Sequence, residues 1–167
     1  MTIASTISTA LEKLGYGGPA GCIAVGRHRQ VINEAVATRT LLPKESDSLC
    51  LFDLAAGVVY TLPAPVVGMQ FEFSISVEGT GSYKIITNAA TVYLTGGLFL
   101  VSLTVAEAGD AFVANGTSHV AITMDADTEG RLKGPMSIKL TAISATQWHV
   151  TGYATGAGTL ADPFATS

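Results

Sequence analysis

The chain has 167 residues, of which 13% are charged, and its mean hydropathy is +0.42. This length suits one domain with a terminal arm. No window reaches the roughly 18 continuous apolar residues of a transmembrane helix. Two cysteines are too few for a disulfide framework or a zinc site.

The scarcity of charge indicates that other subunits cover part of the surface. In a soluble monomer about a quarter of the residues are normally charged. We therefore expect a homo-oligomer. A weakly charged monomer rich in Ser and Thr is the alternative, because neutral polar residues also solvate a surface.

Residues 1–40 are expected to form an extended N-terminal arm. A short helix is predicted at residues 5–14, and the Gly- and Pro-rich segment 15–21 must end it. The strand-like fragments that follow lack a sustained apolar face, so we expect this arm to become ordered against neighbouring subunits. The start of the chain also lacks the basic and apolar regions of a secretory signal, so synthesis in a cytoplasm is expected.

Basic residues are concentrated in this part of the chain. Residues 1–44 carry a net charge of +3, whereas residues 45–167 carry −7. A basic arm can dock on an acidic partner surface. The candidate partner-binding residues are Arg27, His28, Arg29 and Arg39. Nucleic acid is not the expected partner, because this short cluster has no interleaved aromatic residues to stack on bases.

Beyond residue 40, short apolar runs alternate with turn residues. The strictest alternation spans residues 69–77, where one face would carry Met69, Phe71, Phe73, Ile75 and Val77. A period of two predicts a strand with one buried face and one solvated face.

Ten strands are expected, at residues 49–54, 57–62, 69–77, 82–87, 91–94, 98–105, 111–114, 119–124, 136–143 and 146–154. Turn residues separate them, including a Gly96-Gly97 turn between two of the strands. This spacing, with no helical pattern between the strands, predicts an all-β fold over residues 41–154, an antiparallel β-sandwich or jelly roll. The Gly-rich tail, residues 155–167, is expected either to fray or to pack on a neighbouring subunit.

No catalytic, cofactor or metal site is predicted. His28 lies in the basic cluster, and His119 and His149 lie at or within expected strands, so no Ser/Cys–His–carboxylate arrangement is indicated. Residues 125–130 begin like a calcium loop, but Met136 stands where the bidentate Glu is needed. We favour a turn made by Asp side chains, with a weak structural cation as the alternative.

Four aromatic residues are candidates for a sugar-binding groove, because aromatic faces suit apolar ligand surfaces. They are Tyr83, Tyr93, Trp148 and Tyr153. At strand spacing, however, such residues more often belong to a core or an interface.

Four short segments carry a family resemblance: FDLAAG at residues 52–57, YTLPAP at 60–65, GMQFEF at 68–73 and GSYKIIT at 81–87. Together they resemble the head decoration (cement) proteins of tailed bacteriophages, particularly the trimeric jelly-roll cement proteins of cyanophage-like viruses. The resemblance covers about a quarter of the chain. It is a pattern of strands and turns rather than a catalytic signature.

This resemblance implies a non-enzymatic homotrimer on the capsid exterior of a virion, synthesised in the host cytoplasm. It would bind the major capsid protein and stabilise the expanded shell by bridging capsid subunits, with no cofactor, nucleic acid or membrane involved. The alternative function is a phage fibre or receptor-binding β module that recognises host glycans.

Overall fold

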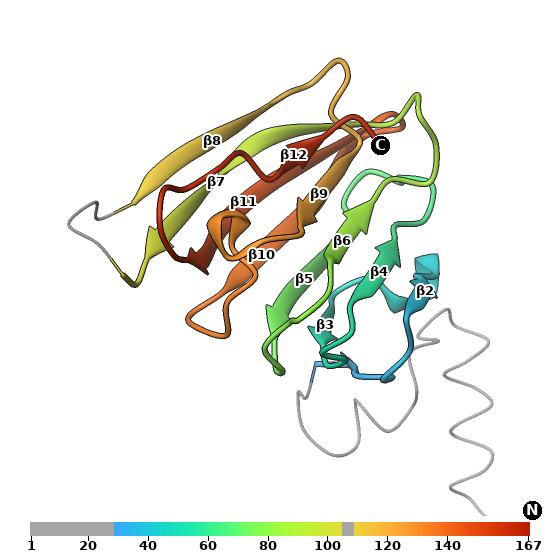
Figure 1. The fold of residues 1–167 in the computed structure, drawn as a ribbon. Helices are drawn as coiled ribbons and strands as arrows, with labels where there is room; N and C mark the ends of the chain where they lie inside the picture. Colours follow the sequence, from blue (N-terminus) through green and yellow to red (C-terminus); the bar gives the residue numbers. More distant parts are fainter. Residues whose placement is uncertain (1–28, 105–108) are drawn as a thin grey trace, which may run out of the picture. The chain divides into compact units, whose positions relative to one another are not determined.

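The computed structural model describes residues 29–104 and 109–167 (Figure 1). Residues Val31–Ser167 form one compact unit, built almost entirely from β-strands in two packed sheets. The expected all-β sandwich is therefore confirmed. The helix expected at residues 5–14 lies outside the described residues.

The larger sheet, sheet A, has seven strands. In spatial order they are β1 (Val31–Ile32), β3 (Ser48–Phe52), β5 (Gln70–Ile75), β10 (Ser137–Ser144), β11 (Gln147–Gly156), β7 (Tyr93–Ser102) and β8 (Asp110–Asn115). Sheet B has five strands, in the order β12 (Phe164–Ala165), β9 (Ala121–Met124), β6 (Tyr83–Ile86), β4 (Val58–Thr61) and β2 (Thr38–Thr40). Two short 3-10 helices, η1 (Pro43–Glu45) and η2 (Asp127–Glu129), lie in the connections.

The first six strands wind as a flattened coil. The chain alternates between the sheets, so that β1, β3 and β5 belong to sheet A and β2, β4 and β6 to sheet B. Every neighbouring pair within these two sets is parallel. Each residue therefore pairs with one a full winding further along: Val31 lies opposite Leu49, and Thr38 opposite Val59.

The rest of the chain folds back in hairpins. Strands β10 and β11 are antiparallel and are joined by Ala145 and Thr146 alone. This hairpin lies in sheet A between β5 and β7, with β10 antiparallel to β5 and β11 parallel to β7. Strands β7 and β8 form a second antiparallel pair, and β9 runs antiparallel to both β6 and β12.

Strand direction is where the structure departs from the expected fold class. Half of the pairings are parallel, so the sandwich is mixed rather than antiparallel. A jelly roll is built from antiparallel neighbours, and the jelly-roll connectivity is not confirmed. Short strands with turn residues between them look alike in sequence whether the chain makes a hairpin or crosses to the opposite sheet.

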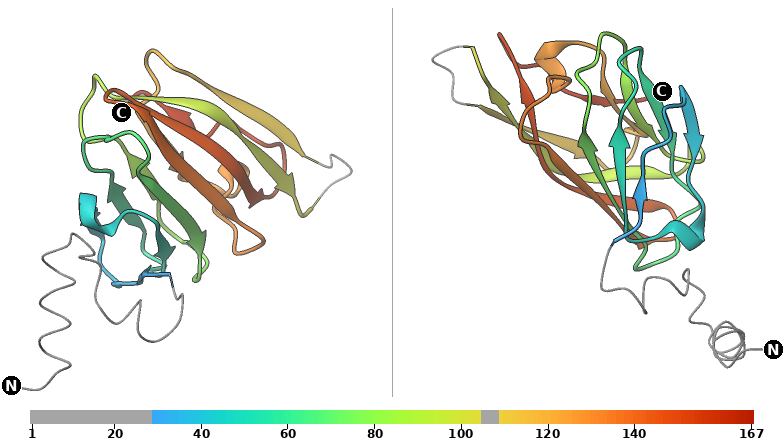
Figure 2. Two further views of the ribbon diagram at one scale, coloured as in Figure 1. Left: turned by 180° about the vertical axis from the view of Figure 1, so that it is seen from behind. Right: turned by 90° about the horizontal axis from the view of Figure 1, so that it is seen from below.

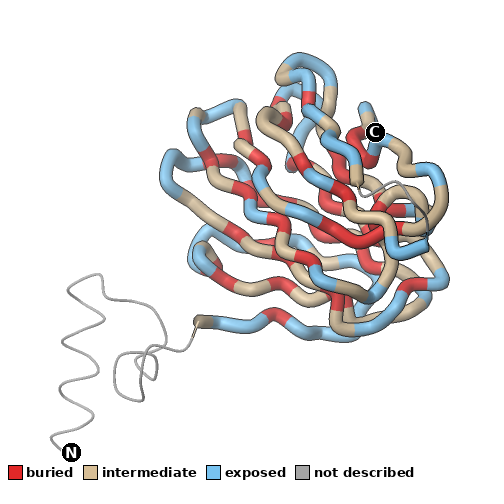
Figure 3. Tube along the Cα trace, turned by 90° about the vertical axis from the view of Figure 1, so that its left-hand side faces the viewer, coloured by how far each residue is buried: buried red, intermediate tan, exposed pale blue. Residues whose placement is uncertain are grey.

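Burial alternates along β3, β4, β5 and β6, as the period of two predicted (Figure 3). In β5 the side chains of Phe71, Phe73 and Ile75 are buried, and the residues between them are partly exposed. One expected turn is wrong, because Gly96 and Gly97 lie inside the single strand β7. A Cβ at Gly96 would come within 2.2 Å of the Val150 carbonyl oxygen, so these glycines permit close approach of neighbouring strands.

Two expected boundaries also differ. The sheets begin at Val31 rather than after residue 40, because β1 and β2 already pair with β3 and β4. At the other end, β11 continues to Gly156, and Phe164 is buried where β12 pairs with β9. The tail therefore packs on its own chain, neither frayed nor in need of a neighbouring subunit.

Four aromatic rings fill the core between the sheets in the coiled part. Phe52 and Phe73 come from sheet A, and Tyr60 and Tyr83 from sheet B. Phe52 stacks on Tyr83 with ring centroids 4.7 Å apart and meets Tyr60 edge-on at 5.4 Å. Such pairs add about 0.5–1.5 kcal/mol each beyond their burial.

Candidate functional site

The predicted basic cluster is only partly within the described residues. Arg27 and His28 lie outside them, and the partly buried Arg29 is near the start of β1. Arg39 lies in β2, on the opposite sheet.

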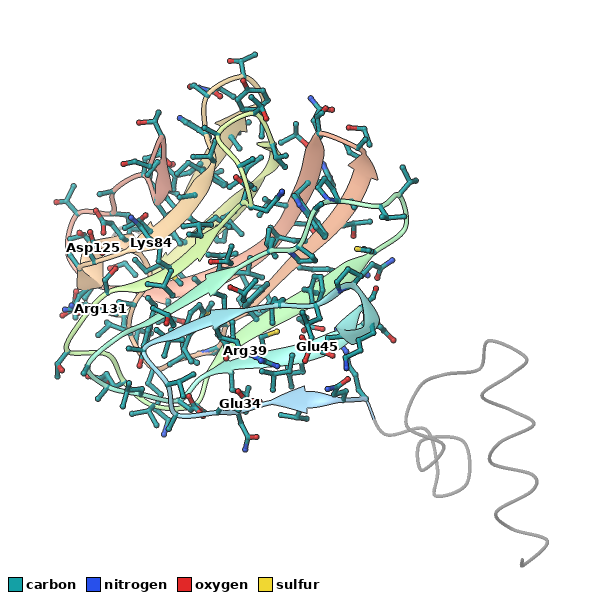
Figure 4. The ribbon with its side chains drawn as sticks, turned by 90° about the vertical axis from the view of Figure 1, so that its right-hand side faces the viewer. Glu34, Arg39, Glu45, Lys84, Asp125 and Arg131 are labelled. Atoms are coloured by element: carbon teal, nitrogen blue, oxygen red, sulfur yellow. The ribbon has the colours of Figure 1, made fainter. Side chains whose placement is uncertain are left out.

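Arg39 is held by carboxylates of its own chain (Figure 4). Its Nη2 lies 2.6 Å from Oε1 of Glu45, and its Nε lies 3.6 Å from Oε2 of Glu34. Glu45 belongs to η1, is only 5% exposed, and accepts the Leu42 backbone N–H at its other oxygen, at 2.8 Å. The ion pair therefore ties edge strand β2 to the connection that leads into β3.

These ion pairs argue against the predicted partner-binding role of Arg39. Two carboxylates offset its charge, so it contributes little attraction toward an acidic partner. Removing it would leave the buried Glu45 carboxylate without its cation, which costs far more than losing an exposed pair. We therefore assign Arg39 to the stability of the fold and keep Arg27, His28 and Arg29 as the partner-binding candidates.

A second charged cluster joins two loops at the far end of sheet B (Figure 4). Arg131 pairs with Asp127 at 2.9 Å and donates to the carbonyl oxygen of Asp125 at 2.6 Å. The same guanidinium reaches the carbonyl oxygens of Thr80 and Gly81, both at 3.5 Å. The loop before β6 is thus fastened to the loop after β9.

The carboxylates of residues 125–130 all have partners within the chain. The Asp125 carboxylate accepts a hydrogen bond from the Ser82 hydroxyl, and the Asp127 carboxylate forms an ion pair with Arg131. The Glu129 carboxylate accepts hydrogen bonds from the backbone N–H groups of Asp125 and Ala126. Gly130 closes the segment with a left-handed φ of 94°. These contacts are those of a turn, and no group of three or more metal-ligating side chains occurs within residues 29–104 and 109–167.

The two described histidines have structural contacts. His119 accepts the backbone N–H of Asn115 at Nδ1, and its ring stacks on Phe164 with centroids 5.8 Å apart. His149 lies beside Thr95, with Nδ1 3.4 Å from the hydroxyl. His119 thereby ties the C-terminal strand to the loop between β8 and β9.

The four candidate groove aromatics do not come together. Trp148 and Tyr83 are fully buried in the core, whereas Tyr153 is 43% exposed. Tyr93 lies opposite Gln147, and this pair is six positions along the strands from the Tyr153–Phe99 pair. At about 3.3 Å per residue, Tyr93 and Tyr153 are therefore roughly 20 Å apart along the strands. A sugar-binding groove made of these residues is therefore excluded.

Sequence reasoning did not identify the exposed apolar side chains as candidates. Two of them, Val66 and Val67, are more than half exposed in the connection between β4 and β5. The Met69 N–H donates to the Val66 carbonyl oxygen, and Gly68 has a φ of 93°, which fits a type II turn. A sequence signal was present, since Val66 and Val67 stand between Pro65 and the turn residue Gly68, outside the alternating run that begins at Met69.

A second exposed apolar set lies on sheet A. Phe99 in β7, Val113 in β8 and Tyr153 in β11 are 46%, 70% and 43% exposed. Their strand neighbours Leu98, Ala114 and Ala154 are buried. The three exposed side chains therefore lie on the outer side of the sheet.

Comparison of the chain with protein-family models, with curated protein sequences and with solved structures finds no match in any of the three. Within the described residues, no helix is long and apolar enough to span a membrane.

Proposed function

We propose that this chain is a capsid decoration (cement) protein of a tailed phage. It acts as a non-enzymatic homo-oligomer, expected to be a trimer, that binds the outside of the head and bridges major capsid proteins. The family resemblance of residues 47–87 suggests this class. The observation that carries the proposal is a surface with little charge and exposed apolar side chains, among them Phe99, Val113 and Ile143, which suits contact with protein.

The proposed mechanism is mechanical. Packaged DNA pushes the shell subunits apart, and a protein that binds only the closed arrangement of several subunits raises the free energy of opening by mass action. The arm can add a strand to the edge of a sheet in a capsid protein. Arg27, His28 and Arg29 would face an acidic patch on that surface.

The direct test adds purified protein to undecorated capsids and measures bound copies and the temperature of thermal rupture. We expect saturable binding of hundreds of copies per head and a higher rupture temperature. No binding, or binding without a change in rupture temperature, contradicts the proposal. A few dozen copies per particle together with hits on a glycan array would instead support the fibre alternative.

The role of the arm is tested with the double variant Arg27→Gln/Arg29→Gln. We expect weaker capsid binding with a smaller salt dependence, because fewer charges meet the capsid. The matched control is Lys44→Gln/Lys133→Gln, which removes the same charge at two exposed positions of the sandwich. Equal effects of the two double variants would contradict a specific role for the arm. Arg39 is left intact, because its substitution would disturb the fold.

A further inference from the structure

The outer side of sheet A carries exposed apolar side chains on each of β11, β7 and β8. In the register of the sheet, Tyr153 lies opposite Phe99, and Phe99 lies opposite Ala111 on its other side. Val113 lies opposite Gly97, two positions along the same strands. Three exposed large side chains from three adjacent strands thus lie on one face of the sheet, within two register positions of one another. The left-hand view of Figure 2 shows sheet A from this side.

This surface is almost free of charge. Apart from Asp110 at the start of β8, the three strands contain no Asp, Glu, Lys or Arg. The first charged outward position toward the centre of the sheet is Lys139 on β10, in register with Thr151 and with Glu72 of β5. An uncharged centre with aromatic residues and a charged or polar rim is typical of protein interfaces.

The absence of charge also indicates which partner would cover this face: a second copy of the chain. The chain has a net charge of −4, so two copies repel each other wherever acidic surfaces meet and approach most easily through an uncharged face. A partner drawn by electrostatic attraction would instead meet charged positions, which this face lacks. Ala111 lies opposite Phe99 and Gly97 lies opposite Val113, and such small residues leave room for a side chain from another copy.

We propose that this uncharged face, the outer side of β7, β8 and β11, is the surface through which copies of this chain associate. Three strands about 4.8 Å apart and up to about 33 Å long offer a footprint of several hundred Å². That is roughly half of the ~800 Å² per partner of a standard interface, and the rim on β10 and β5 supplies the remainder. This inference rests on the proposed function in one respect: both require that copies of this chain associate into a homo-oligomer.

The test measures the mass in solution by light scattering and sedimentation across a concentration series. The variant is Val113→Lys, and the matched control is Val67→Lys, since the two valines are 70% and 69% exposed. We expect an oligomeric wild type, a control of the same mass, and a Val113→Lys variant that dissociates at least ~100-fold more readily because a charge must be desolvated in the interface. Far-UV circular dichroism confirms that each variant is folded, and Tyr153→Lys provides a second substitution in the same face.

Three results would overturn the inference: a monomeric wild type, a folded Val113→Lys variant that keeps its oligomeric mass, or equal dissociation of the Val67→Lys control. Capsid rupture separates this failure from failure of the proposed function. A monomer that still stabilises capsids refutes the interface alone. An oligomer that Val113→Lys dissociates, but that leaves capsids unchanged, refutes decoration alone.

Discussion

The two parts of the sandwich are held together in different ways. In the coil of residues 31–86, each strand pairs with strands one winding away, and the connections stack on one another. In the part that follows, hairpins such as β10–β11 pair neighbouring strands through short connections. The coil therefore depends on contacts between loops, whereas the hairpin part depends mainly on its ladders.

Loop stacking is visible where the connection before β4 meets the connection before β6. The backbone N–H groups of Thr80 and Gly81 both donate to the Ala55 carbonyl oxygen, at 2.7 and 3.0 Å. The Val58 N–H donates to the Ser82 carbonyl oxygen at 3.1 Å. Any atom added between these two connections must separate the windings, so the coil should be more sensitive to small substitutions than the hairpin part.

The largest expected effect is that of Gly81→Ala. A Cβ at this position would lie 1.9 Å from the Ala56 carbonyl oxygen, and backbone cannot yield as a flexible side chain does. We expect a loss of about 3 kcal/mol or more in the free energy of unfolding, measured by urea denaturation.

The control for this substitution is Gly68→Ala. Gly68 has a φ of 93°, but nothing lies within 4 Å of the added Cβ, so only backbone strain of about 1 kcal/mol is expected. If the two variants lost equal free energy of unfolding, the stacking of the connections would not be what makes the coil sensitive to small substitutions.

The next effect is that of Glu45→Ala, which tests the first winding. The substitution removes the 2.6 Å pair with Arg39 and the acceptor for the Leu42 N–H. We expect a loss of about 2–3 kcal/mol. Glu34→Ala is the control: its carboxylate is 56% exposed and 3.6 Å from Arg39, so it should cost at most about 0.5 kcal/mol. Equal losses would show that Glu45 does not anchor β2.

A third test concerns alkaline pH and the aromatic core of the coil. Burial, above all, raises the pKa of Tyr60, and the Tyr60 hydroxyl donates to the Leu51 carbonyl oxygen at 2.8 Å. The unfolded chain releases this proton from about pH 10 upward, before the folded chain does. The stability that Tyr60 contributes is thus present below pH 10 and lost as the pH rises toward its folded pKa.

The comparison for this prediction is Tyr60→Phe. We expect a loss of about 1 kcal/mol at neutral pH, from the missing hydrogen bond, and a flatter decline in stability above pH 10. Urea denaturation at a series of pH values measures both. A decline as steep as that of the wild type would assign the alkaline sensitivity to other groups, such as Tyr83, whose pKa burial also raises.

The smallest effect is expected in the hairpin part, for Trp148→Phe. Trp148 is fully buried, and its indole N–H has no hydrogen-bond partner in the described part of the chain. The variant loses apolar contact but also removes an unsatisfied donor, and these effects oppose each other. We expect a change of about 1 kcal/mol or less by urea denaturation. A loss of several kcal/mol would show that the indole packs tightly enough to outweigh its unpaired N–H.

Much of the local structure could be predicted from the sequence. The alternation of residues 69–77 located β5, and turn residues separated most of the other strands. The Gly96-Gly97 pair was wrongly predicted as a turn because glycine marks both turns and close strand contacts. Here β11 approaches closely at Gly96 and β8 at Gly97. For the candidate site, the sequence indicated Arg39 as basic but not that Glu45, six residues on, would neutralise it.

What the sequence alone determined was that the fold is all-β, because side-chain alternation is a property of consecutive residues. Strand partners, the parallel winding of the coil and the outer face of β7, β8 and β11 were decided only by the tertiary structure. The physical reason is distance along the chain. Thr95 meets His149 across 54 residues, and no local pattern specifies which two strands, among many of similar length and hydrophobicity, will pair.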